Sequence, residues 1–260
     1  MDAQEIPPDI NSMASVNRLA RKYAVIIPAC NEEACLPQVL AELRAALDPE
    51  IFFVVVGVNA STDRTAAVAL EAGALVAQTH LRGYGHGCQV AVSRAQEAAP
   101  PVDAYIFFAA DGANDPQDIA ALVARHEAGV PMVLGCRTRT ASNRTVMNAH
   151  YVLANRAFGL ICGLLTGRFF ADLGPLRLIA RPLFERLELR EWTYGWTIEA
   201  QIRAALLGEL IEEVPVRERR RVAGEQKVSH VSWRRTLSVA VQIVAAALRT
   251  RFAGLGRRAA

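Results

Sequence analysis

The chain has 260 residues, of which 52% are hydrophobic and 21% charged, so it can form a large core and is not generally disordered. Its net charge of +3 is unevenly distributed: residues 217–260 contain eleven basic and two acidic residues, whereas residues 1–216 carry a net charge of −6. A basic tail of this kind favours an anionic partner, such as phosphate, nucleic acid or a membrane surface.

The cysteines and the apolar runs indicate a cytoplasmic protein. None of the five cysteines forms a C-x-x-C pair, which argues against a disulfide scaffold or a zinc site and fits a reducing compartment. Residues 1–20 lack the apolar core of a signal peptide. No uncharged apolar run reaches the roughly 18 residues of a membrane-spanning helix, so we expect a soluble or peripheral protein.

In the first half of the chain, short apolar runs alternate with segments in which apolar residues recur at helical spacing. The predicted strands are residues 24–28, 51–58, 74–78, 105–108 and 131–135. The predicted helices are residues 33–47, 62–72, 86–98 and 116–128. This alternation indicates a parallel α/β sheet, in which ligands bind at the carboxyl ends of the strands.

The second half continues the pattern and ends in an amphipathic helix. Its predicted elements are a helix at 145–166, a strand at 176–179, a helix at 195–207, a strand at 211–216 and a helix at 232–251. The last helix has apolar residues at near-helical spacing and arginines at both ends. It can pack on the domain, or it can lie on an anionic membrane surface.

Polar residues follow the first three predicted strands. Asn31 and Glu32 follow the first, where an acidic residue also suits the start of a helix. Asn59, at the end of the second, is placed to bond a base or a ribose. The loop at 82–87 contains three alternating glycines, which admit close approach of the backbone, and Arg82 beside them is a candidate to bind a phosphate.

A carboxylate, Asp111, follows the fourth predicted strand. A carboxylate at a strand end beside a phosphate site usually binds a hard divalent cation through oxygen. Asp115, followed by Pro116, is instead typical of a helix N-cap with proline at the first helical position.

Nine short motifs follow one another along the chain. The first four are Pro-x-x-Asn-Glu (28–32), Asn-x-Ser-Thr-Asp (59–63), Arg-Gly-Tyr-Gly (82–85) and Asp-Gly-x-x-Asp-Pro (111–116). The others are Gly-Cys-Arg (135–137), Ala-Asp-Leu-Gly-Pro-Leu-Arg (171–177), Tyr-Gly-Trp-Thr-Ile-Glu (194–199), Glu-Val-Pro-Val (213–216) and Arg-x-x-Gly-x-x-Lys (221–227). Together they resemble the GT-A fold of family 2 glycosyltransferases, in the branch of the dolichyl- and polyprenyl-phosphate sugar transferases.

The resemblance implies transfer of a sugar from a nucleotide-diphospho-sugar donor, with inversion at the anomeric carbon. It implies a three-part chain: an N-terminal extension (1–21), a GT-A domain (22–230), and a basic amphipathic helix and tail (231–260). It also implies a lipid-phosphate acceptor, peripheral contact with the membrane and a place at its cytoplasmic face. Nucleic acid is not an expected partner, because no recognised binding motif accompanies the basic stretch.

The resemblance also assigns site residues. The implied donor site consists of Pro28, Asn31, Glu32, Asn59, Arg82, Gly83, Asp111 and Arg137. The implied catalytic residues are Asp111, which also binds Mg²⁺ or Mn²⁺, Asp172, Arg221 and Lys227. Asp172 and Glu199 are implied on the acceptor side. A phosphate acceptor needs no general base, whereas a hydroxyl acceptor needs one, for which Asp172 is the candidate.

Four positions depart from the family pattern: Ala109, Cys136, Gln226 and His230, the last in place of a glycine. Ala109 stands where the first aspartate of an Asp-x-Asp is usual, so Asp111 remains alone and we expect weaker metal binding. Gln226 replaces a serine next to Lys227, and Cys136 replaces another serine. These departures leave open a different donor or acceptor, or a degenerate module that binds nucleotide or a partner without catalysis.

Overall fold

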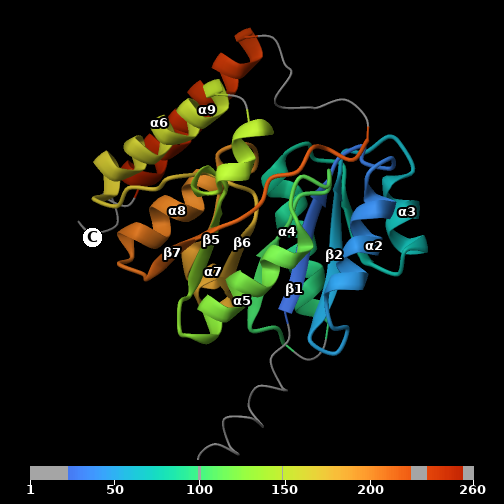
Figure 1. The fold of residues 1–260 in the computed structure, drawn as a ribbon. Helices are drawn as coiled ribbons and strands as arrows, with labels where there is room; N and C mark the ends of the chain where they lie inside the picture. Colours follow the sequence, from blue (N-terminus) through green and yellow to red (C-terminus); the bar gives the residue numbers. More distant parts are fainter. Residues whose placement is uncertain (1–22, 99–100, 148, 224–232, 254–260) are drawn as a thin grey trace, which may run out of the picture.

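The computed structural model describes residues 23–98, 101–147, 149–223 and 233–253 (Figure 1). The predicted N-terminal extension and the predicted catalytic residue Lys227 lie outside these ranges. Within the described ranges, no helix combines the length and the apolar character needed to cross a bilayer.

A seven-stranded sheet with the order β3-β2-β1-β4-β6-β5-β7 forms the centre of the domain. The strands are β1 (Tyr23–Ala29), β2 (Phe52–Asn59), β3 (Leu75–Thr79), β4 (Ala104–Phe107), β5 (Met132–Cys136), β6 (Arg177–Ala180) and β7 (Ile211–Pro215). All seven predicted strands are confirmed. The expected parallel sheet is parallel except at β6, which runs antiparallel to β4 and β5.

Helices cover both faces of the sheet, because its central strands bury the side chains of both faces. On one face lie α2 (Leu36–Ala46), α3 (Thr65–Glu71) and α5 (Ile119–Glu127). On the other lie α4 (Tyr84–Glu97), α7 (Arg181–Leu187) and α8 (Trp196–Leu206). Val25 and Ile27 of β1 face the first group, and Ala24 and Ile26 face the second.

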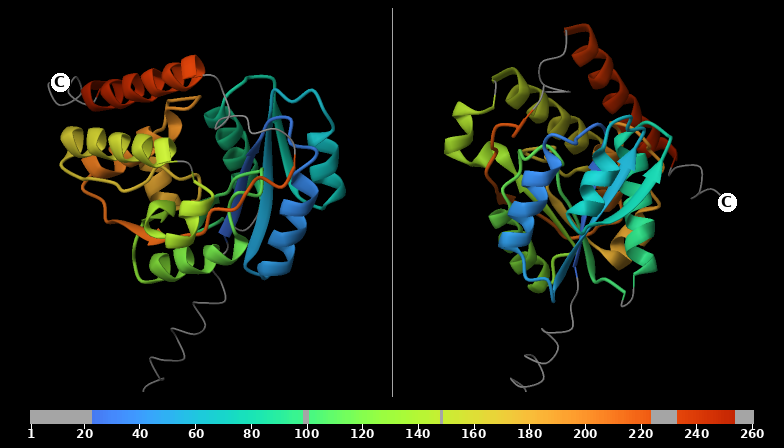
Figure 2. Two further views of the ribbon diagram at one scale, coloured as in Figure 1. Left: turned by 45° about the horizontal axis from the view of Figure 1, so that its top comes forward. Right: turned by 90° about the vertical axis from the view of Figure 1, so that its right-hand side faces the viewer.

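Two further helices form an outer layer on α8. They are α6 (Ala149–Thr166) and α9 (Trp233–Ala253), which pack on α8 and on each other (Figures 1 and 2). Their positions confirm the predicted helices at 145–166 and 232–251. The short helix α7 was not among the predicted elements.

The order of the strands creates a switch point between β1 and β4. The chain proceeds from β1 outward through β2 and β3, and then returns to the other side of β1 with β4. Ligands of open α/β sheets bind in the crevice at such a point, beyond the carboxyl ends of the two strands. The residues that follow β1 and β4 therefore define where a site is expected.

Candidate active site

The loops after β1 and β2 are fastened to each other by polar groups. Asn31 has a left-handed backbone (φ 54°), and its Oδ1 accepts a hydrogen bond from the backbone N of Thr62 at 2.7 Å. The backbone N of Asn31 donates to Ser61 Oγ at 3.0 Å, and that of Glu32 donates to Thr65 Oγ1 at 2.8 Å. These bonds hold the two strand ends together and fix the start of the segment that carries Glu32.

Two of the predicted donor contacts pack against protein atoms. Asn59 is buried, and a Cβ added to Gly87 would lie 2.8 Å from its Oδ1, so α4 packs directly on this side chain. Gly83 has a φ of 150°, and a Cβ there would overlap the carbonyl oxygen of Trp192. The glycines of the 82–87 loop thus admit close approach of protein atoms, whereas contact of this loop with a donor phosphate stays a prediction. Arg82 beside them is exposed.

Residues 216–223 form an extended segment, here called the strap, that leaves β7 and crosses the carboxyl ends of the strands (Figure 1). The backbone N of Arg219 donates to the Ala113 carbonyl at 2.8 Å, and that of Val222 donates to the Asp111 carbonyl at 3.0 Å. Gly112 has a φ of 79°, and a side chain there would collide with Val222. The strap therefore lies directly on the loop that follows β4.

Three predicted site residues meet where the strap crosses the loop after β4: Arg221 of the strap, Glu32 and Asp111. Both guanidinium Nη atoms of Arg221 donate to the Glu32 carboxylate, one of them at 3.2 Å, and Nη1 lies 3.7 Å from Asp111 Oδ2. Burial lowers the pKa of Arg221, but the hydrogen bonds and charge of Glu32 outweigh burial and raise it above its usual value. A fixed cation thus lies beside two carboxylates at the β1/β4 switch point.

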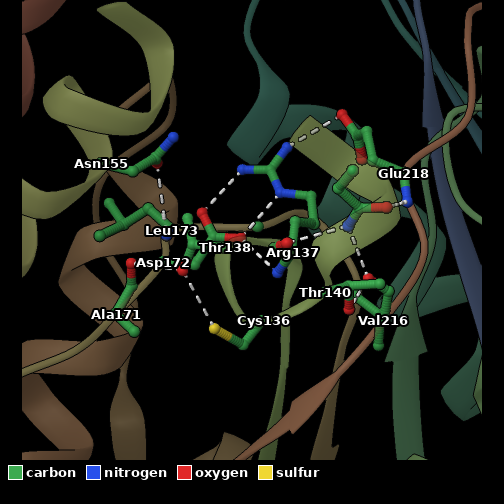
Figure 3. Close-up of polar contacts among 12 residues, drawn as sticks. Cys136, Arg137, Thr138, Thr140, Asn155, Ala171, Asp172, Leu173, Val216 and Glu218 are labelled. Atoms are coloured by element: carbon green, nitrogen blue, oxygen red, sulfur yellow. Dashed lines mark hydrogen bonds and ion pairs between the residues drawn. The ribbon is translucent and has the colours of Figure 1, made fainter. Parts of the chain in front are cut away.

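A second buried cluster contains Arg137 and Asp172 (Figure 3). The backbone N and Nε of Arg137 both donate to Asp172 Oδ2 at 2.8 Å, and Nη2 donates to Oδ1 at 2.9 Å. A general base needs a lone pair directed at the substrate, whereas both oxygens of Asp172 already accept from Arg137. The geometry therefore makes Asp172 the anchor of Arg137, which argues against its predicted role as a base.

Glu218 of the strap completes this second cluster and was missed in the sequence. Arg137 Nη1 donates to Glu218 Oε1 at 3.2 Å, whereas Oε2 is buried and has no hydrogen-bond partner among the described atoms. Burial raises the pKa of Glu218 to about 7, against the opposing effect of Arg137. In the sequence Glu218 was only one of two acids in the basic tail, and no motif marked it.

The pKa of Glu218 makes the stability of the protein depend on pH. The carboxyl group is protonated up to about pH 7 in the folded chain but ionises near its ordinary value of 4.5 when the chain unfolds. Its contribution is therefore present below pH 4.5 and is lost as the pH rises through 7.

We expect Glu218→Gln to raise the free energy of unfolding by about 1–3 kcal/mol at pH 8 and to change it little near pH 5. Urea unfolding at both pH values measures the difference. Glu212→Gln, in a more exposed ion pair with Arg125, is the matched control and should keep the wild-type pH dependence. An unchanged pH dependence in Glu218→Gln would contradict the assignment.

Glu199, predicted on the acceptor side, is a buried residue of α8. Its Oε2 accepts hydrogen bonds from the backbone N of Arg190 at 2.8 Å and of Glu191 at 2.7 Å, and Oε1 accepts from Arg203 Nε at 2.8 Å. These bonds fix the loop that carries Trp192 against α4. Contact between Glu199 and an acceptor stays a prediction.

Part of the basic tail is neutralised within the protein. Four of its arginines bind carboxylates of the acidic body: Arg217 with Asp118, Arg219 with Glu42, Arg221 with Glu32, and Arg249 with Glu191. The expectation that the tail charge is directed at an external anion therefore applies only to the remainder. The strap is held on the domain largely by these pairs.

The surroundings of Asp111 allow one carboxylate to reach a divalent cation. Asp111 Oδ1 accepts from the backbone N of Ala113 at 3.1 Å, and the side chain is 31% exposed. Across the described part of the chain, no three His, Cys, Asp or Glu side chains cluster as a metal site. This arrangement fits Mg²⁺ or Mn²⁺ that shares oxygens of a bound diphosphate, and does not fit an ion held by protein ligands alone.

The chain is similar in sequence to known glycosyltransferases. The sequence model of glycosyl transferase family 2 matches residues 24–188. An uncharacterised glycosyltransferase of Mycobacterium tuberculosis is 32% identical over 209 residues, covering 79% of this chain and 88% of that protein. A dolichyl-phosphate hexose transferase of Haloferax volcanii is 30% identical over 207 residues, covering 79% and 86%.

A solved structure is also similar along most of its length. It is glucosyl-3-phosphoglycerate synthase from Mycobacterium tuberculosis, in complex with Mn²⁺, UDP and glucosyl-3-phosphoglycerate. The TM-score is 0.63 at 21% identity, and the match covers 96% of this chain and 86% of that one. At this identity the likeness concerns the fold.

Proposed function

The chain belongs to glycosyl transferase family 2, and we propose that it transfers a sugar from a nucleotide-diphospho-sugar to a lipid-linked phosphate, with inversion at the anomeric carbon. Its fold is the GT-A fold that the motifs led us to expect. The observation that carries the proposal is the cluster of Glu32, Asp111 and Arg221 at the β1/β4 switch point.

Departure of the nucleoside diphosphate is the step that needs positive charge. We assign Arg221 to the diphosphate, because its guanidinium is held by Glu32 and lies 3.7 Å from Asp111. A divalent cation bound by Asp111 and the diphosphate would offset the remaining charge. The proposed contribution of Lys227 lies outside the described residues.

We also assign the strap a role in this reaction, which is to exclude water from the donor. It covers the loop after β4 and is attached there through Arg219 and Val222. A cover over the reacting sugar excludes water and so limits hydrolysis of the donor. Contact with the donor stays a prediction for Pro28, Asn31, Asn59, Arg82 and Gly83.

The proposed acceptor is a phosphate monoester of a lipid. Its oxygen is already an anion, so it can attack the anomeric carbon without a base while the bond from that carbon to the diphosphate breaks. The engagement of Asp172 by Arg137 is consistent with a reaction that needs no base at that position. Similarity to a dolichyl-phosphate hexose transferase supports the same acceptor class.

Nucleotide release tests the proposal. Purified protein is incubated with UDP-, GDP- and dTDP-sugars, Mn²⁺ and a short-chain polyprenyl phosphate, with the corresponding polyprenol as the matched hydroxyl acceptor. We expect release with one donor class that requires the phosphate acceptor, and a product of opposite anomeric configuration. Release that requires the polyprenol instead would contradict the acceptor, and donor binding without release would indicate a binding-only module.

A further inference from the structure

We infer that Trp192 and Tyr194, on the loop before α8, bind the sugar ring of the donor and so take part in selecting which sugar is transferred. The two side chains are 42% and 45% exposed. The inference rests on the proposed function and deepens it. Arg221 and Asp111 are assigned to the diphosphate and its cation, so the sugar needs a binding surface of its own.

The loop that carries these residues, 188–195, lies on the start of α4. The backbone N of His86 donates to the Trp192 carbonyl at 3.2 Å, and a side chain at Gly83 would overlap the same oxygen. One residue after His86, a Cβ added to Gly87 would lie 2.9 Å from the Cβ of Pro28 in β1. The loop is therefore beside the carboxyl end of β1.

The same loop ends beside β4. It leads into α8, whose first residue, Trp196, packs its ring on that of Phe107, with the ring centroids 4.7 Å apart. Phe107 is the last residue of β4, and the segment that carries Asp111 follows it. Loop 188–195 thus borders the β1/β4 switch point, where the crevice for a ligand is expected.

The strap borders the same crevice from the other face of the sheet. Cys35, at the start of α2, donates from Sγ to the Ala223 carbonyl of the strap at 3.1 Å. Helix α2 lies on the face of the sheet opposite α4 and α8. A donor whose diphosphate is bound by Arg221 would therefore lie between the strap on one side and loop 188–195 on the other.

Trp192 is held in place although its side chain is exposed. Its indole stacks on the imidazole of His86, with the ring centroids 5.0 Å apart and an interplanar angle of 9°. Glu199 accepts hydrogen bonds from the backbone N of residues 190 and 191, and Glu191 pairs with Arg249 of α9. An aromatic side chain fixed in this way loses little conformational entropy when a ligand covers it.

The chemistry of Trp192 and Tyr194 fits a sugar ring better than the other parts of the donor. Both side chains combine an apolar ring with a polar tip, as a hexose combines C–H faces with hydroxyl groups. Neither is cationic, so neither suits the diphosphate. The base is expected near Asn59 at the end of β2, and the sugar lies at the opposite end of the diphosphate, toward β4 and α8.

Calorimetric titration with matched ligands tests the inference. UDP-, GDP- and dTDP-hexoses are each compared with the nucleoside diphosphate that lacks the hexose, all with Mn²⁺. We expect Trp192→Ala to weaken binding of the nucleotide-hexose at least about tenfold, and binding of the nucleoside diphosphate less than about twofold. Trp192→Phe keeps a ring face and should bind within about threefold of wild type. Leu207→Ala, at the opposite end of α8 and 45% exposed, is the control and should bind both ligands as wild type.

Circular dichroism and thermal unfolding check that the variants fold. If Trp192→Ala does not fold, Trp192→Leu replaces it with the same expected results, because Leu still packs on His86 but offers no ring face. Equal weakening of both ligands would assign Trp192 to the base or the diphosphate and overturn the inference, as would unchanged affinity for both. Either result leaves the proposed transfer intact, whereas a wild-type protein that binds no nucleotide-hexose would contradict the proposed function and the inference with it.

Discussion

Asp111→Asn is expected to lower kcat/KM for sugar transfer at least about a thousandfold, because it weakens the one carboxylate that β4 presents to a diphosphate-bound cation. Ala109 offers no second carboxylate to compensate. Stability should change little, since Asn retains an Oδ1 that can accept from the backbone N of Ala113. Nucleotide release with Mn²⁺ measures the effect.

The control for this variant is Asp48→Asn, which makes the same chemical change in a turn between α2 and β2. It should keep the wild-type rate. A rate for Asp111→Asn within about tenfold of wild type would show that transfer does not depend on this carboxylate.

Arg137→Met is expected to lower the free energy of unfolding by about 3–5 kcal/mol, because it leaves the buried Asp172 without its cation. Three hydrogen bonds join the two residues, and the Met variant keeps only the one that the backbone N of residue 137 donates. Urea unfolding at neutral pH measures the loss.

The double variant Arg137→Met with Asp172→Asn separates charge from packing. It removes the uncompensated carboxylate, so we expect it to be more stable than Arg137→Met alone. If Arg137→Met alone costs less than about 1 kcal/mol, the pair is not the buried anchor that its geometry indicates.

The strands could be predicted because apolar runs mark segments buried on both faces of a sheet. Phe52–Asn59 is such a run, and the structure places it between β1 and β3. Direction is a different property: Arg177–Ala180 has the same apolar character as its neighbours but runs antiparallel to them, which only tertiary pairing determines. Helix α7 has seven residues, too few for a clear helical period.

The site residues that directly follow parallel strands could be predicted from the sequence. Glu32 and Asp111 follow β1 and β4, and parallel strands bring their carboxyl ends to one edge. Which residue each of these side chains contacts could not be predicted in the same way. The resemblance implies that Asp172 and Glu199 are acceptor-side groups, yet their bonds to Arg137 and to the backbone at 190–191 depend on contacts between separate elements.

Glu218 illustrates what a sequence pattern conceals. An acid within a basic run suggests a solvated ion pair, whereas the strap carries this carboxylate into a buried position beside Arg137. The neighbouring arginines of the strap are likewise bound to body carboxylates. Net charge along the chain could therefore identify the segment, but not which of its charges face solvent.

The central claim is that Arg221, held by Glu32, binds the donor diphosphate, and that Asp111 binds the cation shared with that diphosphate. Calorimetric titration of wild type, Arg221→Ala and Arg217→Ala with the nucleotide-sugar and Mn²⁺ tests it most directly. Arg217 lies on the same strap and pairs with Asp118, so it controls for loss of a strap arginine. We expect Arg221→Ala to weaken donor binding at least about tenfold, as for a lost charge-assisted contact, and Arg217→Ala to bind as wild type. Equal donor affinity in all three proteins would contradict the claim.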